Sequence, residues 1–193
     1  MSQCAGYYSV KMENNNDIVS EFEEKARRGL SEFLVKKGAL DEIVPECADL
    51  EEKWPAIVRS YLPDGAREFQ NYPVVSLGWM MFVGMAMAHY WDEDWESNAA
   101  RTDFYTALRD RRGYDEMDEA VLEEVIKCEG EELERVSDLV ADCASRLYSL
   151  IMHAKVEPGT QEAFGIYVAA LHQLYLAGVA VELNALGYHM TKI

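Results

Sequence analysis

Residues 74–88 read VVSLGWMMFVGMAMA and lie within a longer segment, Phe69 to Trp91, that carries no formally charged side chain. A second uncharged run extends from Ala163 to Val181. A helix that is apolar on every side has to be surrounded, either by other helices or by lipid. The two runs predict an all-α fold, a single-domain bundle of about six to eight helices around two fully apolar central helices.

Both runs are long enough to cross a bilayer, which takes roughly 20 residues. However, no cluster of Lys or Arg flanks either run to set an orientation, and Asp92, Glu93 and Asp94 follow the first run directly. The second run contains His172 and Gln173 near its middle. We therefore expect the buried centre of a soluble protein and no membrane contact.

Small residues recur along both apolar runs, including Gly78 and Gly84 in the first and Gly165 and Gly178 in the second. Glycine inside a helix costs about 1 kcal/mol relative to alanine, so a gain in packing should offset it. Close approach of the two helix backbones is the simplest such gain. The two helices are predicted to cross each other at the centre of the bundle.

The chain is strongly acidic, with 35 acidic against 18 basic residues and a net charge of −17 over 193 residues. The length suits one domain. A surface this negative repels phosphate backbones, which disfavours nucleic-acid binding and favours a basic protein partner.

The cysteines are scattered and form no C-x-x-C pair, and no apolar leader follows Met1. This usage is typical of free thiols in a reducing compartment, so a cytoplasmic location is expected. Zinc binding would need a tighter cluster of Cys and His. The cysteines occupy positions Cys4, Cys47, Cys128 and Cys143.

Residues 1–16 show no periodicity and are predicted to be a flexible N-terminal segment, with residues 17–193 forming the helical domain. The sequence Asn14 to Asp17 has helix-starting chemistry, and the spacing from Ile18 to Phe33 predicts an amphipathic helix. Gly38 is well placed to end that helix.

Turn-forming residues divide the rest of the chain into further helices. Pro63-Asp64-Gly65 predicts a turn. N-cap candidates at Asp94 to Asn98 predict a helix that runs to about Arg112 and ends at Gly113. A further helix is expected over 115–127, and a heptad-like seam predicts a long helix over 133–154. Pro158-Gly159-Thr160 should separate it from the second apolar helix, which is expected to run from Glu162 to about Leu186.

The best candidate for a site follows the first apolar run. If the helix continues, His89, Asp92, Glu93 and Glu96 fall at i, i+3, i+4 and i+7 and share one face. Carboxylates at a helix C-terminus face the negative end of the dipole, a repulsion that a bound cation or a nearby arginine would relieve. A His with several carboxylates is a plausible set of metal ligands. If the helix instead stops near Trp91, the same acids cap the next helix and are structural.

His172 lies inside the second apolar helix, where it is either hydrogen-bonded in the core or lines a pocket. Glu182 could share a face with His189, and a buried Glu182 would need a partner. Because Glu182 is near the helix end, it is expected to reach solvent.

Motifs for catalysis and nucleotide binding are missing. No acid lies three residues before any histidine, as di-iron helical proteins require, and H-E-x-x-H, G-x-S-x-G and the phosphate-binding glycine loops are absent. The sequence therefore favours a non-enzymatic interaction or regulatory module that acts on a basic partner or by self-association. The alternative is a small-molecule or metal-binding protein, with or without catalysis, whose site is formed by His89 to Glu96 and His172; the cofactor, if any, is unknown.

Overall fold

The computed structural model describes residues 2–42 and 44–188, with side chains from Asp17 onward. All regular structure within these ranges is helical, which confirms the all-α prediction. The elements are α1 (Ser2–Lys36), α2 (Ala48–Glu51), α3 (Trp54–Glu68), α4 (Pro73–Asn98), α5 (Phe104–Arg112), α6 (Met117–Glu119), the π-helix η1 (Ala120–Ile126), α7 (Glu131–His153) and α8 (Gln161–Ala185).

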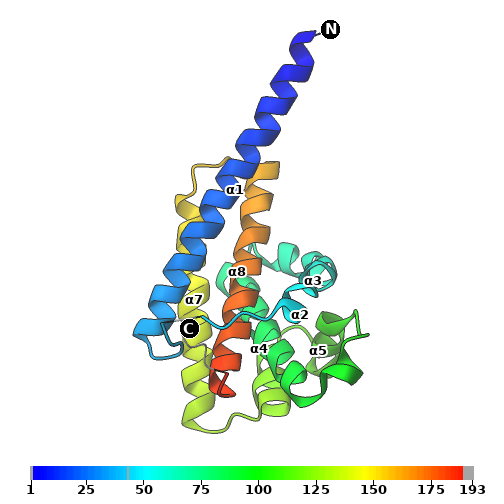
Figure 1. Ribbon diagram of the computed structural model, residues 1–193, viewed down its shortest axis with the longest axis vertical. Helices are drawn as coiled ribbons and strands as arrows, with labels where there is room; N and C mark the ends of the chain where they lie inside the picture. The colour runs from blue at the N-terminus through cyan, green and yellow to red at the C-terminus, as the bar shows by residue number, and fades with distance from the viewer. Residues whose placement is uncertain (1, 43, 189–193) are drawn as a thin grey trace.

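Helices α4 and α8 are the centre of the bundle, as their apolar sequences predict. Every residue of α4 from Ser76 to Ala88 is buried, and α8 is buried over most of Ile166 to Leu183. Helices α1, α7 and α8 run lengthwise side by side, and the shorter helices gather around α4 (Figure 1).

The predicted crossing of α4 and α8 is confirmed, and two glycines make it possible. A Cβ atom at Gly84 would overlap the carbonyl oxygen of Tyr175, and a Cβ at Gly178 would overlap that of Met81. Each helix backbone therefore lies directly against the other. Of the remaining small residues, Gly78 faces α7 instead, where its Cβ would lie 3.3 Å from Val140.

The two central helices retain the composition of membrane spans. Both are long and apolar enough to cross a bilayer, and 78% and 72% of their most apolar 18-residue windows are buried within the protein. The core helices of a soluble protein have the same property. That the protein is soluble, with α4 and α8 as its core and not as membrane spans, thus stays a prediction from the sequence.

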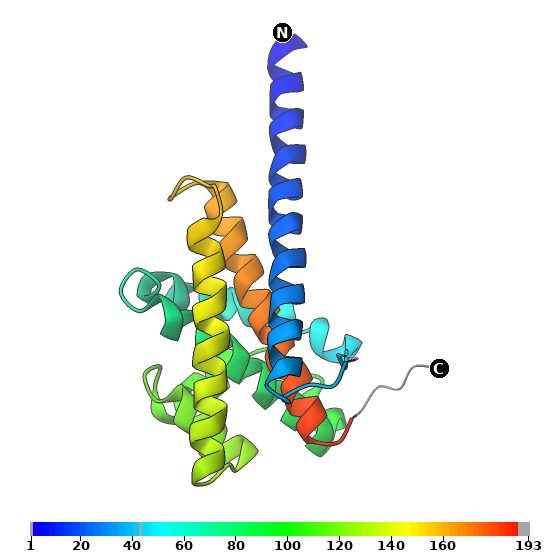
Figure 2. The same ribbon diagram turned by 90° about the vertical axis from the view of Figure 1, so that its left-hand side faces the viewer.

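Helix α1 begins at Ser2, well before the predicted start near Asp17. Its N-terminal part extends beyond the ends of α7 and α8 (Figure 2). No proline interrupts this part, and Asn and Asp in a helix interior cost only a few tenths of a kcal/mol each, so capping chemistry does not force a start. Flexibility of residues 1–16 stays a prediction.

The turn predicted at Pro63-Asp64-Gly65 is wrong, because α3 continues through it to Glu68. Proline lacks an N–H and costs about 3 kcal/mol in a helix interior. Packing overrides this cost here. Tyr61 is fully buried, and its ring lies over Gly65 on the next turn, where a Cβ would collide with it.

The helix predicted from Asp94 to Arg112 is divided in two. Asp94 has non-helical backbone angles, φ −164° and ψ 85°, and its side chain accepts hydrogen bonds from the Ser97 N–H at 3.1 Å and the Ser97 hydroxyl at 2.6 Å. Asp94 therefore caps only a last turn of α4. The next helix, α5, starts at Phe104 and ends at Gly113 as predicted.

The long helices that follow agree with their predictions to within a few residues. The helix expected over 115–127 is α6 followed by the π-helix η1, and the π-helical form was not predicted. η1 ends at Ile126 and is followed by Lys127, which has φ 64°. The heptad-like seam forms α7. Thr160 caps α8 by accepting a hydrogen bond from the Ala163 N–H at 3.2 Å.

Candidate functional site

A cavity of about 580 Å³ lies between the C-terminal end of α1, α4, η1, α7 and the last turns of α8. Its wall is apolar in part and strongly polar in part, and is more polar than that of most small-molecule sites. The apolar wall residues include Met85, Ile126, Val136, Leu139, Val181 and Leu186. The polar ones are Lys37, His89, Cys128, Glu132, Arg135, Asp138, Asp142, Glu182 and Asn184.

Two residues from the central helices meet on this wall. His89 Nδ1 lies 3.2 Å from Glu182 Oε1, and Glu182 is only 3% exposed. Burial raises the pKa of the Glu182 carboxyl, and the hydrogen bond with His89 opposes that rise. The pair joins α4 to α8 and provides the most deeply buried ionisable group of the cavity wall.

The position of Glu182 follows from the glycine crossing. Residues four apart share one face of a helix, so Glu182 lies one turn beyond Gly178 on the face that contacts α4. By the same spacing, His89 lies one turn beyond Met85, which also lines the cavity. The face that holds the helices together is therefore continued by the two polar residues.

The basic residues of the cavity wall already have acidic partners. Lys37 Nζ lies 3.1 Å from Asp142 Oδ2, and Arg135 Nη2 lies 3.4 Å from Glu132 Oε1. The side chains of both pairs are half-exposed or more. Glu182 and His89 are much less exposed, with side-chain exposed fractions of 4% and 18%.

Cys128 lines the same cavity but is poorly suited to be a nucleophile. It is 6% exposed, and burial, with Glu132 and Glu182 nearby, raises the pKa of its thiol. The thiolate, which is the reactive form, is therefore disfavoured. Cys47 and Cys143 are also free thiols, and the side chain of Cys4 lies outside the described residues.

The structure separates the residues that the sequence grouped after the first apolar run. Asp92, Glu93 and Glu96 are exposed and do not line the cavity, unlike His89. Asp92 Oδ1 accepts a hydrogen bond from the Tyr188 hydroxyl at 2.6 Å. Among the described residues no three His, Cys, Asp or Glu side chains are placed to hold one metal ion.

His172 also lies apart from the cavity. Its ring stacks on Trp54 of α3, with centroids 4.7 Å apart and planes 21° apart. Burial lowers the pKa of His172, and its Nε2 atom is buried without a hydrogen-bond partner. The neutral imidazole is thus favoured, in an aromatic contact between α3 and α8.

Glu182 is the residue that the sequence placed wrongly, because it was expected to reach solvent and is buried. His189, which could share a helix face with Glu182, lies outside the described residues. The usable signal was the spacing of four from Gly178, which assigns Glu182 to the buried face. That signal depends on knowing which glycine faces α4, and the sequence offers several.

A second polar cluster lies near the N-terminal ends of the same two helices. The fully buried hydroxyl of Ser76 donates to the Gly65 carbonyl oxygen at 2.8 Å and accepts from the Tyr167 hydroxyl at 3.0 Å. The Tyr61 hydroxyl donates to the Ser76 carbonyl oxygen. Burial raises the pKa of both tyrosines, which keeps them neutral. These groups satisfy one another within the core.

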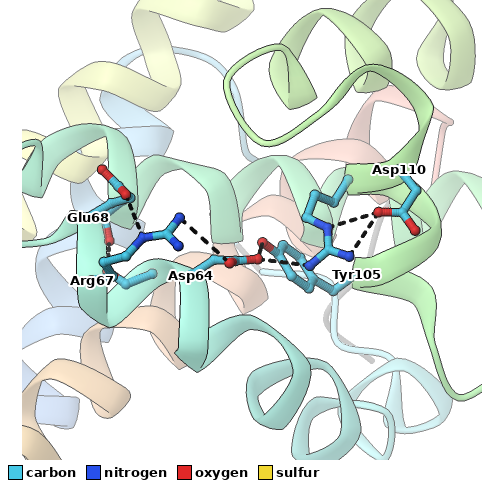
Figure 3. Close-up of polar contacts among 8 residues, drawn as sticks. Asp64, Arg67, Glu68, Tyr105 and Asp110 are labelled. Atoms are coloured by element: carbon cyan, nitrogen blue, oxygen red, sulfur yellow. Dashed lines mark hydrogen bonds and ion pairs between the residues drawn. The ribbon is translucent and has the colours of Figure 1, made fainter.

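A third polar group links α3 to α5 at the surface (Figure 3). The Asp64 carboxylate accepts hydrogen bonds from the Tyr105 hydroxyl at 2.7 Å and from Arg109 at 3.0 Å, and these bonds lower the pKa of Asp64 against its partial burial. Arg67 lies 3.9 Å away and is mostly exposed. We assign this group to holding the two helices together.

No protein-family model, curated protein or solved structure matches this chain. The geometry of the cavity and its wall is therefore the observation from which a function can be inferred.

Proposed function

We propose that this protein binds a small organic molecule in the cavity bounded by α1, α4, η1, α7 and α8. The observation that carries the proposal is the buried Glu182 carboxyl, hydrogen-bonded to His89, on the wall of a cavity of about 580 Å³. Cavities of roughly 300–1,000 Å³ with a few convergent polar groups are typical ligand sites.

Of the residues in the site predicted from the sequence, only His89 belongs to the proposed binding site. Asp92, Glu93 and Glu96 are on the exposed side, and His172 contacts Trp54 instead. Glu182 takes their place as the acidic partner. A metal is a weaker hypothesis than an organic ligand, since the described residues bring no third ligand to His89 and Glu182.

A cavity-filling substitution tests the proposal. Val136 is partly buried and lines the cavity from α7, so Val136→Trp should fill much of the space. Ligand-observed NMR with a fragment library of neutral, cationic and anionic members should give binders to the wild-type protein that are lost in Val136→Trp.

The matched control is Val75→Trp, which makes the same change at a position on α4 that is 46% exposed and outside the cavity. Its fragment binding should equal that of the wild type. The proposal is wrong if no fragment is lost in Val136→Trp and kept in Val75→Trp, provided that circular dichroism shows both variants folded.

Self-association is a second candidate, favoured by the extension of α1 beyond the bundle (Figure 2). Most of the stability of helices in proteins comes from packing against another surface, so a second copy that packs on this extension would stabilise it. Residues 2–16 contain one Lys and one Glu, so two copies can meet there without the repulsion expected of a chain at −17.

Sedimentation of the full chain over a range of concentrations tests this second candidate. A dimer that is lost when residues 2–16 are deleted supports it, and a monomer at all concentrations removes it. A basic protein partner, a cytoplasmic location and the absence of nucleic-acid or membrane binding stay predictions from composition.

A further inference from the structure

The charges on the cavity wall are unevenly matched. Four acids line it, Glu132, Asp138, Asp142 and Glu182, against the two bases Lys37 and Arg135. Because each base is paired with an acid at the rim, neither is free to attract an anion. The wall therefore presents more negative than positive charge to a ligand.

Of these four acids, Glu182 is by far the least exposed to solvent. Glu182 is 3% exposed, and its hydrogen bond with His89 joins Oε1 to the Nδ1 atom of the ring. A carboxylate has about four acceptor positions, so capacity remains beyond that bond. A buried carboxylate is costly unless a donor or cation compensates it, and the low local dielectric strengthens that compensation.

The remaining wall is suited to a hydrocarbon group. Met85 and Val181 flank His89 and Glu182 on α4 and α8, while Val136 and Leu139 face them from α7. Methionine adapts to ligands of irregular shape. A ligand with one charged end and an apolar body matches both parts of the wall.

We propose that the ligand of this cavity is an organic cation, an amine with an apolar body, whose ammonium group binds the Glu182 carboxylate while its body packs on Met85, Val136 and Val181. This inference rests on the proposed function and adds the chemical class of the ligand. It assigns Glu182 the recognition of charge and His89 the positioning of the carboxylate.

Three probes of similar shape and different charge test the inference: benzylamine, benzyl alcohol and benzoate. Affinities measured by NMR titration at neutral pH should rank benzylamine first, benzyl alcohol second and benzoate last. Benzyl alcohol or benzoate binding as tightly as benzylamine would overturn the cation assignment and leave the binding cavity intact. Failure of all three probes to bind at the cavity would also overturn the inference. The fragment screen with Val136→Trp then shows separately whether the cavity binds any small molecule.

A charge-neutral variant locates the recognition. In Glu182→Gln the affinity for benzylamine should fall about tenfold or more, as expected for a hydrogen bond to a charged group, while benzyl alcohol changes less than about twofold. Glu157→Gln is the control, because it removes the same charge from an exposed loop outside the cavity. An equal loss in both variants would mean that the ligand senses only the net charge of the protein.

A rim variant keeps the test valid if Glu182→Gln does not fold. Asp142 is about half-exposed and pairs with Lys37, so Asp142→Asn releases a cation at the mouth of the cavity without disturbing the core. Benzylamine should then bind about two- to fivefold more weakly and benzoate more tightly. Unchanged affinities for both would contradict the proposed orientation of charge.

Discussion

The two ends of the α4–α8 pair are both polar, yet they differ in kind. Near the N-terminal ends, Ser76 and Tyr167 form a closed hydroxyl cluster with the Gly65 carbonyl, all of it buried and neutral. Toward the C-terminal ends, His89 and Glu182 form an ionisable pair that opens onto a cavity. A polar group in a core is a structural element when its partners are internal. It becomes a candidate binding group when acceptor capacity faces open space.

The glycine crossing lies between these two ends and should have the largest effect on stability. Gly178→Ala puts a Cβ onto the Met81 carbonyl oxygen, and backbone atoms cannot move aside without separating the helices. We expect the free energy of unfolding to fall by about 3 kcal/mol, measured by urea denaturation. Both the closed and the open end should be disturbed.

Gly29→Ala is the matched control for this change. Gly29 lies inside α1, and no atom is within 4 Å of the position that an alanine Cβ would occupy there. Alanine is the better helix former, so this variant should be more stable by about 0.5–1 kcal/mol. If both glycine variants change stability in the same direction, close packing is not the reason for glycine at position 178.

The closed end should show the next largest effect. Ser76→Ala removes the hydrogen bonds that the Ser76 side chain makes with the Gly65 carbonyl and the Tyr167 hydroxyl, while the Gly65 carbonyl keeps its bond from the Phe69 N–H at 2.9 Å. The loss should cost about 1–2 kcal/mol of unfolding free energy. Tyr167→Phe should lower the free energy of unfolding less in the Ser76→Ala protein than in the wild type, because the Ser76 and Tyr167 hydroxyls form one hydrogen bond with each other. Fragment binding at the cavity should not change. Loss of fragment binding in folded Ser76→Ala would show that the two ends are not independent.

The open end should have the smallest effect on stability, and that effect should depend on pH. Burial raises the folded-state pKa of Glu182 above its ordinary value of 4.5. Protonation of Glu182 therefore contributes to the free energy of unfolding. This contribution is complete below about pH 4.5 and is lost as the pH rises through the folded-state pKa. Glu182→Gln has no such proton to lose, so its stability relative to the wild type should increase with pH.

Melting temperatures of the two proteins between pH 4 and pH 8 measure this difference, and groups remote from Glu182 and its partner His89 contribute equally to both proteins. Glu157→Gln again serves as the control and should follow the wild type at each pH. A constant difference between Glu182→Gln and the wild type across the range would show that Glu182 is not the buried acid that the structure describes.

The sequence predicted the parts of this fold that are set by local composition. A helix with no charged face has to be surrounded by other helices or by lipid, and the composition of α4 and α8 predicted their central position in the bundle. Gly38, Gly113 and Thr160 mark helix boundaries because their backbone or side-chain chemistry acts within one turn. The turn at Pro63 was predicted by the same local rule and was wrong, since burial of Tyr61 outweighs the proline.

The candidate site required the tertiary structure. Local spacing placed His89, Asp92, Glu93 and Glu96 on one face, but proximity in sequence does not make residues share a cavity. The partner of His89 is Glu182, 93 residues away.

What the sequence alone determined is that two apolar helices form the centre of a helical bundle, because the hydrophobic effect acts on composition and periodicity. What only the tertiary structure decided is which face of each helix meets the other. Gly84 and Gly178 contact the opposite backbone while other glycines do not, and that choice directs His89 and Glu182 to one cavity wall. The physical reason is that close packing depends on the shapes of both surfaces together, and neither segment contains that information by itself.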